Sequence, residues 1–311
     1  MNVNCINEVK NSWPLAYAEC SGGILTGRVR LIDHLVLTAC LQNCLLSDRL
    51  NVEIILSRDL GKLLEEVNFE DLHYTIGLLH DLGKASLYYL DSFISTLTKQ
   101  FKANEVKPIE LKFPEHEHVI SLLLEKLALL EHREVFKALY DLIAKIISRH
   151  HTAMPGRHPN IASKRIKEKH ALIAFIKTMQ NMCNNSVIKF VEGLLSFCEK
   201  RVLCTYVLKA LVENLHREKF CIADLYYFNA LQSFEVAGLG KSMDLKKVYI
   251  LVTILTGSLM IADNIAAEFE RRSSDEGGSR LYVEYWKREL GNRLYDCLKK
   301  CSIGSEREVS W

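Results

Sequence analysis

The sequence predicts an all-α (mainly helical) protein, a bundle of helices around one core. Three observations lead to this fold class. Apolar residues recur at three- and four-residue spacing over most of the chain, and strand-like alternation is scarce. Only 5 prolines and 15 glycines occur among 311 residues, which argues against a turn-rich β fold. Finally, 49% of the residues are hydrophobic, enough to build a substantial core.

The helical spacing is clearest in six stretches with few internal glycines or prolines: residues 31–48, 71–90, 117–130, 132–150, 186–215 and 245–270. Weak strand patterns occur only at 52–56 and near 106–113. Proline, glycine and small polar residues mark three expected loops, at 100–116, 152–160 and 272–279. No composition change divides the chain sharply. We therefore expect one domain over 1–271, with 272–311 as a C-terminal loop and helical extension packed on it.

Charge and cysteine content indicate the compartment and the kind of partner. A net charge of +2 means that any contact with nucleic acid must come from a local basic patch. The ten cysteines contain no CxxC pair, and the closest pairs have the i,i+4 spacing of helical packing. Because the N-terminus MNVNCINEVK is polar and has no signal-peptide pattern, we expect reduced thiols in a cytoplasmic protein.

The most hydrophobic stretch, VYILVTILTGSLMIA at 248–262, is the place to look for a membrane span. It has only fifteen residues and runs directly into Asp263 and Asn264. A spanning helix needs about 20 apolar residues, so a buried core helix is the better interpretation. We expect no contact with a membrane.

Several side chains that can bind metals lie in apolar surroundings. Singly, each has an ordinary explanation as a hydrogen-bonded core histidine, a polar helix end or an ion-paired aspartate. Together they come from several separate helices, which is how helical bundles assemble metal sites. A metal would also offset the cost of burying them. The set comprises His34, the adjacent His80 and Asp81 in GLLHDLGK, His116 and His118 in FPEHEHVIS, the pair His150 and His151, and Asp263.

The remaining five histidines are expected to be ordinary surface or packing residues: His73, His132, His158, His170 and His216. Within the candidate set, imidazole and carboxylate without thiolate suit Mn²⁺, Fe, Co, Ni or Mg²⁺ better than a structural zinc. There are more candidates than one four-coordinate ion needs. We therefore expect two divalent ions with Asp81 as the bridging carboxylate, His80 and Asp81 lying about 100° apart on one helix.

The doublet resembles the HD superfamily of metal-dependent phosphohydrolases, which is named for it. The order and spacing resemble more closely the HD nuclease of type I CRISPR interference, over roughly residues 25 to 270. The matching positions are His34, 46 residues before His80; His80, Asp81, Gly83 and Lys84 as HDxGK; His118 followed by Ser121; His150 with His151; and Ala262 with Asp263. His116 competes with His118 for the third position.

The resemblance implies a ligand set and roles. One ion would be held by His34, His80, Asp81 and Asp263, and a second by Asp81, His118, His150 and His151. Asp81 and Lys84 would be the catalytic residues. Lys84 would also contact a phosphate oxygen, with Ser121 as a further substrate-binding residue, although Lys84 could equally be a surface lysine.

Two further motifs bear on the substrate and on partners. The basic stretch PGRHPNIASKRIKEKH offers Arg157, Lys164 and Arg165 to a polyanion, or is simply a solvated helix face. GLGKS at 238–242 is not a phosphate-binding loop, because Glu235 stands where GxxxxGK[ST] needs glycine. Without an ATPase motif, a helicase would have to be a separate polypeptide.

The resemblance thus implies a metal-dependent nuclease that cuts single-stranded DNA in CRISPR interference. It would work with a separate CRISPR helicase subunit and an RNA-guided surveillance complex. Two alternatives stay open. The chain could be an HD phosphohydrolase acting on nucleotides or cyclic nucleotides, or a non-catalytic HD scaffold that docks partners.

Overall fold

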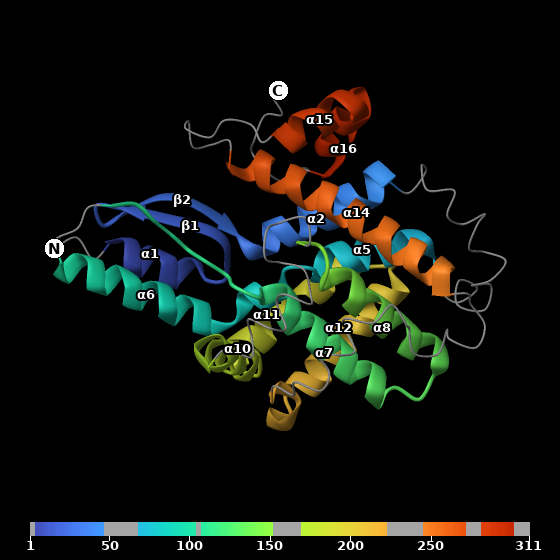
Figure 1. Cartoon of the computed structure of the whole chain (residues 1–311), viewed down its shortest axis with the longest axis horizontal. Coiled ribbons are helices and arrows are strands. Elements are labelled where there is room, and N and C mark those ends of the chain that lie inside the picture. Colours follow the sequence, from blue (N-terminus) through green and yellow to red (C-terminus); the bar gives the residue numbers. More distant parts are fainter. Residues whose placement is uncertain are drawn as a thin grey trace.

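The computed structural model describes residues 4–46, 68–103, 107–151, 169–222, 245–271 and 281–301, and these are mainly helical (Figure 1). They form twelve α-helices, two short 3-10 helices and one three-stranded sheet. The prediction of an all-α, mainly helical fold is therefore confirmed. Outside the described residues lie the weak strand pattern at 52–56, the expected loops at 152–160 and 272–279, and the GLGKS stretch.

The helices of the first half are α1 (Asn4–Ser12), α2 (Leu31–Leu46), α5 (Phe69–Leu79), η1 (Leu82–Ala85), α6 (Leu87–Lys102), α7 (His116–Leu130) and α8 (Glu134–Ile147). Those of the second half are α10 (Lys169–Met182), α11 (Asn185–Cys198), α12 (Val202–Leu215), η2 (Glu218–Cys221), α14 (Leu245–Arg271), α15 (Leu281–Leu290) and α16 (Asn292–Cys301). The sheet has the antiparallel order β2-β1-β3, with strands β1 (Leu15–Ser21), β2 (Ile24–Arg30) and β3 (Ile109–Glu110).

Two helices that the periodicity predicts as continuous are interrupted. The stretch 71–90 leaves the α-helix after Leu79, passes through η1 and continues as α6. The break falls at Asp81, whose φ of −107° and ψ of 7° are not helical. The stretch 186–215 is divided into α11 and α12 at Glu199, which has a φ of 40°. Apolar residues keep facing the same core across a short break, so periodicity alone does not reveal it.

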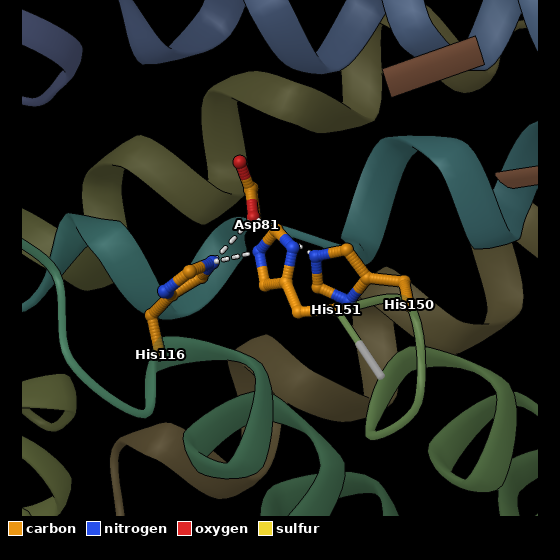
Figure 2. A group of neighbouring side chains, drawn as sticks. All are labelled: Asp81, His116, His150 and His151. Carbon is orange, nitrogen blue, oxygen red and sulfur yellow. Dashed lines mark hydrogen bonds and ion pairs between the residues drawn. The ribbon is translucent and has the colours of Figure 1, made fainter. Parts of the chain in front are cut away.

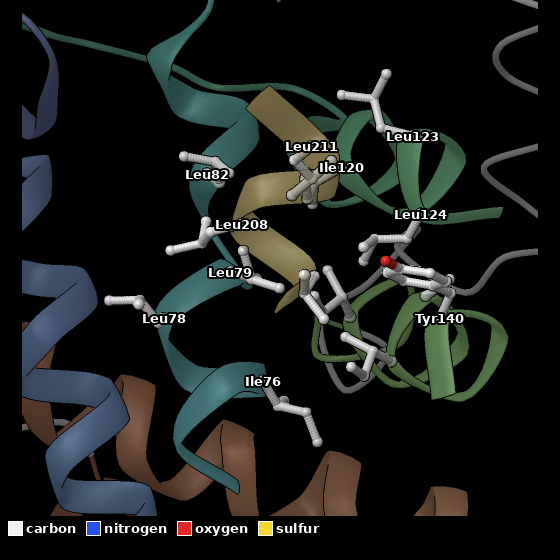
Figure 3. Packing of buried hydrophobic residues seen from close by; sticks show 14 of the residues in the cluster. Ile76, Leu78, Leu79, Leu82, Ile120, Leu123, Leu124, Tyr140, Leu208 and Leu211 are labelled. Atoms are coloured by element: carbon white, nitrogen blue, oxygen red, sulfur yellow. The ribbon is translucent and has the colours of Figure 1, made fainter. Parts of the chain in front are cut away.

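Helix α5 runs through the middle of the main core. Every residue from Phe69 to Leu79 except Glu70 is buried. Figure 3 shows part of this core, with residues of α7, α8 and α12 on one side of α5 and Leu78 pointing to the other side. The labelled residues are Ile76, Leu78 and Leu79 of α5, Leu82 of η1, Ile120, Leu123 and Leu124 of α7, Tyr140 of α8, and Leu208 and Leu211 of α12. Burying each such side chain contributes about 1.5–3 kcal/mol. This packing fixes the end of α5, where the His-Asp doublet begins.

Two polar residues of α5 are buried for different reasons. The Asp71 carboxylate accepts hydrogen bonds from the backbone N–H groups of Leu203 and Cys204, at 2.8 and 3.3 Å. It thereby satisfies donors that the first turn of α12 would leave unpaired. Of the two roles expected for His73, surface or packing, it has the packing role: it is fully buried and packs edge-on against Phe69.

Helix α14 lies beside α2, and the C-terminal helices α15 and α16 cover the two (Figure 1). Leu41, Ile265 and Leu294 belong to the apolar cluster that joins them. Among the described residues, α14 is the one helix long and apolar enough to cross a membrane, and 61% of its most apolar window is buried inside the protein. That burial is typical of a core helix. The domain division at 271/272 stays a prediction.

The expectation of reduced thiols is corrected, because all ten cysteines are paired. The disulfides are Cys5–Cys20, Cys40–Cys301, Cys44–Cys297, Cys183–Cys221 and Cys198–Cys204. Two of them join α2 to α16 across sequence separations of 261 and 253 residues. The i,i+4 spacing on each helix was the visible pattern, but the partner cysteines come from the other helix.

Candidate metal centre

Five parts of the fold bring polar side chains to one buried point. His34 lies in the first turn of α2, and His80 and Asp81 lie at the junction of α5 and η1. His116 begins α7, His150 and His151 follow the end of α8, and Asp263 projects from α14. The interruption of the predicted helix at Asp81 therefore lies at the centre itself.

The two glycines of GLLHDLGK allow this convergence. A Cβ at Gly77 would lie 2.5 Å from Ala39 Cα, so glycine lets α5 cross close to α2, which carries His34. A Cβ at Gly83 would lie 2.2 Å from the carbonyl oxygen of His116, so glycine lets η1 approach the start of α7. Real Cβ atoms do not approach so closely, and any larger residue would push these elements apart.

The first group of side chains comprises His34, His80, Asp81 and Asp263, all buried. His34 Nε2 lies 3.2 Å from both Asp81 Oδ2 and Asp263 Oδ1. His80 Nε2 lies 3.4 Å from the same Asp81 oxygen and 3.5 Å from the same Asp263 oxygen. Tetrahedral ligands at about 2.1 Å from an ion are separated by roughly 3.4 Å. The four donors therefore have the spacing of a first coordination sphere.

The second group comprises Asp81, His116, His150 and His151 (Figure 2). Asp81 Oδ1 lies 2.7 Å from His116 Nε2 and 3.5 Å from His150 Nε2. His151 Nε2 lies 3.3 Å from His116 Nε2. Asp81 thus belongs to both groups, with one carboxylate oxygen directed to each.

Hydrogen bonds on the far side of the ring orient four of the five imidazoles. His80, His116 and His150 each use Nδ1 on the carbonyl oxygen three residues earlier, at 2.7, 2.6 and 2.7 Å. His34 instead uses Nδ1 on the buried carboxylate of Glu270, at 2.8 Å. Since carbonyl and carboxylate oxygens only accept, Nδ1 donates in every case. In the neutral ring, Nε2 then presents its lone pair to the centre.

The donor set therefore fits divalent metal ions. The Nε2 atoms of His34, His80 and His150 are buried and make no hydrogen bond within the described part of the chain. Leaving such a polar atom buried and unbonded is costly, and a cation at that point removes the cost. The His/Asp groups could hold a metal, which supports the expectation of a divalent metal cofactor in general terms.

The electrostatics of the centre also favour a cation. Burial would raise the pKa of Asp81, but its cationic neighbours, His80 first, hold the pKa well below the usual range. Burial lowers the pKa of His80, yet Asp81 and Asp263 outweigh it and raise the pKa to about 9. The carboxylates therefore stay ionised at neutral pH and draw positive charge. A divalent ion supplies this positive charge in place of the imidazole protons, which the ligands lose when they bind metal.

The structure revises the third histidine. His116, not His118, faces Asp81, so the second group differs from the expected one in this residue. His118 is fully buried on another side of α7, with Nε2 at 3.5 Å from Glu115 Oε2 and 3.9 Å from Glu117 Oε1. Two positions apart on a helix means about 200° of rotation, so both rings cannot face the same centre.

The residues expected to contact the substrate differ in whether they reach the cavity beside the centre. Lys84 Nζ lies 2.5 Å from Asp81 Oδ2, and Lys84 lines the small cavity that reaches His34 and Asp263. Ser121 is fully buried, and its hydroxyl donates to the Glu117 carbonyl at 2.6 Å, so it does not reach that cavity. The expectation for Ser121 is therefore corrected: a hydroxyl on the inner face of α7 bonds its own helix. Arg157, Lys164 and Arg165 lie outside the described residues.

Glu270 is the residue that sequence reasoning missed. It comes seven residues after Asp263 on α14, two helical turns further along the same face. An acidic residue at this spacing from a ligand candidate, in a helix otherwise apolar on that side, is the signal that could have identified it. Its bond to His34 also gives a carboxylate–histidine pair of the kind that supports metal ligands.

Fold and site together define a helical protein with a buried histidine–aspartate centre able to hold metal ions, the class of the HD-type hydrolases. The family model described as "Cas3, HD domain" matches residues 21–270, which is most of the chain. The chain therefore belongs to the Cas3 HD-domain family, and the resemblance seen in the sequence is confirmed. No curated protein and no solved structure matches it.

Proposed function

We propose that this chain is a metal-dependent nuclease that hydrolyses phosphodiester bonds of single-stranded DNA in CRISPR interference. Membership of the Cas3 HD family implies a CRISPR-associated hydrolase of nuclease type. The preference for single-stranded DNA and the use of two ions are the specific parts of the proposal.

The observation that carries the proposal is the position of Asp81. Its two carboxylate oxygens face two different histidine groups, at 3.2 Å from His34 Nε2 and 2.7 Å from His116 Nε2. A carboxylate shared in this way is the arrangement that a pair of adjacent ions requires. His34, His80 and Asp263 would complete one ion's ligands, and His116, His150 and His151 the other's.

When bound, divalent ions supply an acidified water at neutral pH and positive charge for the phosphoryl oxygens. The protein's part is to hold the geometry. Carbonyl and carboxylate acceptors fix the imidazoles of His34, His80, His116 and His150 with Nε2 inward, and Asp81 and Asp263 stay ionised. Lys84, whose ammonium already contacts Asp81, stands in the cavity where it can bind a phosphate oxygen.

The proposed partners follow from the family and from the sequence. A nuclease for single strands needs an activity that separates a duplex, which a separate CRISPR helicase subunit would supply. An RNA-guided surveillance complex would choose the DNA. A phosphohydrolase acting on nucleotides is the enzymatic alternative, since the same centre could hydrolyse a small phosphoester. A non-catalytic scaffold is less well supported, because it needs no buried polar group of this size.

Circular and linear single-stranded DNA incubated with Mn²⁺, Mg²⁺ or Ni²⁺ tests the proposal. We expect cleavage of both substrates with at least one metal, and cleavage of the circle would show endonuclease action. Asp81→Ala removes the shared carboxylate and should lower the rate by more than 100-fold. His132→Ala is the control, because His132 is exposed and follows α7 at the end opposite to His116. Equal activity in the Asp81 variant would refute the proposed site.

A further inference from the structure

A small, partly open cavity of about 90 Å³ reaches the first metal group. His34, Lys84 and Asp263 face it from the metal centre. Its walls come from the hairpin of β1 and β2 and from the last two turns of α14, and include Tyr17 and Arg271. The four side chains of the first group are otherwise buried. A phosphodiester reaching them through this cavity therefore passes the hairpin and the end of α14.

Arg271 stands at this passage in a defined position. Its guanidinium carbon lies 4.6 Å from the centre of the Tyr17 ring, a cation–π contact. The Tyr17 hydroxyl also donates to Glu19 Oε2 on the same strand, at 2.6 Å. A Cβ at Gly27 would lie 3.0 Å from the Tyr17 ring, so glycine on β2 leaves room for it. The tyrosine thus supports the arginine.

Helix α14 relates this arginine to the metal centre. Glu270 follows Asp263 by seven residues and Arg271 follows it by eight, so the three lie on one side of the helix. Eight residues correspond to about 12 Å along the axis. Arg271 therefore begins about two turns beyond Asp263 and lines the same cavity. Glu270, the acidic neighbour, is bonded to His34.

We propose that Arg271, supported by Tyr17, binds a phosphate adjacent to the scissile phosphate of an oligonucleotide strand. The inference rests on the proposed function and specifies its substrate as a strand instead of a single nucleotide. A guanidinium suits this role because it makes charge-assisted, bidentate hydrogen bonds to phosphate. Tyr17 and Arg271 both lie just outside the family match at 21–270, so that match assigns them no role.

The test is the dissociation constant of a fluorescent, nuclease-resistant phosphorothioate single strand with Mn²⁺, measured by anisotropy. Arg271→Ala should weaken binding about tenfold, the value of one charged phosphate contact. It should also reduce the slope of log K against log salt by about 0.7, the contribution of one phosphate on a single strand. Arg271→Lys should keep the slope, and Tyr17→Ala should weaken binding while Tyr17→Phe should not.

Arg28→Ala is the matched control, since Arg28 is exposed on the same hairpin and donates to Ser12 Oγ instead of lining the cavity. Its affinity and salt slope should match the wild type. Unchanged binding by Arg271→Ala, an equal loss in Arg28→Ala, or no binding by the wild type would each overturn the inference. Thermal unfolding of each variant checks that it is folded.

Hydrolysis of the small diester bis(p-nitrophenyl) phosphate separates this inference from the proposed function. The small ester does not extend to Arg271, so Arg271→Ala should leave its hydrolysis unchanged. If Arg271→Ala lost strand binding and ester hydrolysis to the same extent, Arg271 would act through the metal centre, and the inference would be wrong. A wild type that binds the resistant strand through Arg271 but hydrolyses neither the small ester nor unmodified single-stranded DNA would refute the nuclease alone.

Discussion

The bond between Glu270 and His34 offers the sharpest test of how the centre is built. The pair is buried, and the His34 Nδ1–H donates to the carboxylate across 2.8 Å. Glu270→Gln keeps the length of the side chain and an acceptor oxygen but removes the charge that makes the imidazole a stronger ligand. Loss of such a supporting carboxylate typically weakens metal binding 10- to 100-fold. We expect about tenfold, or about 1.4 kcal/mol, at the first group only.

The second group should not respond, because His150 is oriented by the Ile147 carbonyl and not by Glu270. Isothermal titration of metal-free protein with Mn²⁺ resolves the two affinities. Glu268→Gln, at a partly buried position two residues earlier on α14, is the control and should bind as the wild type does. Equal weakening at both groups, or no change at either, would refute the reasoning.

Two further predictions concern other histidines. His116→Ala should lower the metal content by one ion and His118→Ala should not, as counted by mass spectrometry of the purified proteins; the opposite result would restore His118 as the ligand. His73 is buried with its pKa lowered by burial to about 4, whereas the unfolded chain has about 6.5. The unfolded state therefore gains a proton as the pH falls through 6.5, so stability drops by about 2 kcal/mol between pH 7 and 5. Urea unfolding at several pH values measures this drop. The His73→Leu variant should lack it, and a variant with the pH dependence of the wild type would contradict the prediction.

Local patterns predicted the long helices well. Helices α7 and α14 begin and end within one residue of the expected stretches 117–130 and 245–270, because an apolar stripe at helical spacing depends only on nearby residues. The hairpin of β1 and β2 was missed, although its Gly22–Gly23 turn, with φ of 57° and 84°, is a recognised hairpin signal. Its strands are short and are covered by α1 and α6, so their burial is a matter of tertiary packing.

The cysteines show the same limit of local reasoning. Cys40 and Cys44 share one helix, and Cys297 and Cys301 share another, with spacing that packing alone explains. Each bonds a cysteine of the opposite helix because α2 and α16 lie side by side. Contact between segments more than 250 residues apart is not visible in the spacing within either one.

By itself, the sequence determined the helical class, the family and the set of side chains that could bind metal, since residue type and helical period are local properties. Only the tertiary structure decided which of them meet. It broke the helix at Asp81, directed that carboxylate to two groups, selected His116 over His118 and brought Glu270 to His34. These outcomes depend on how closely α2, η1, α7 and α14 approach one another. That approach is set by packing between distant segments, down to the missing Cβ of Gly83.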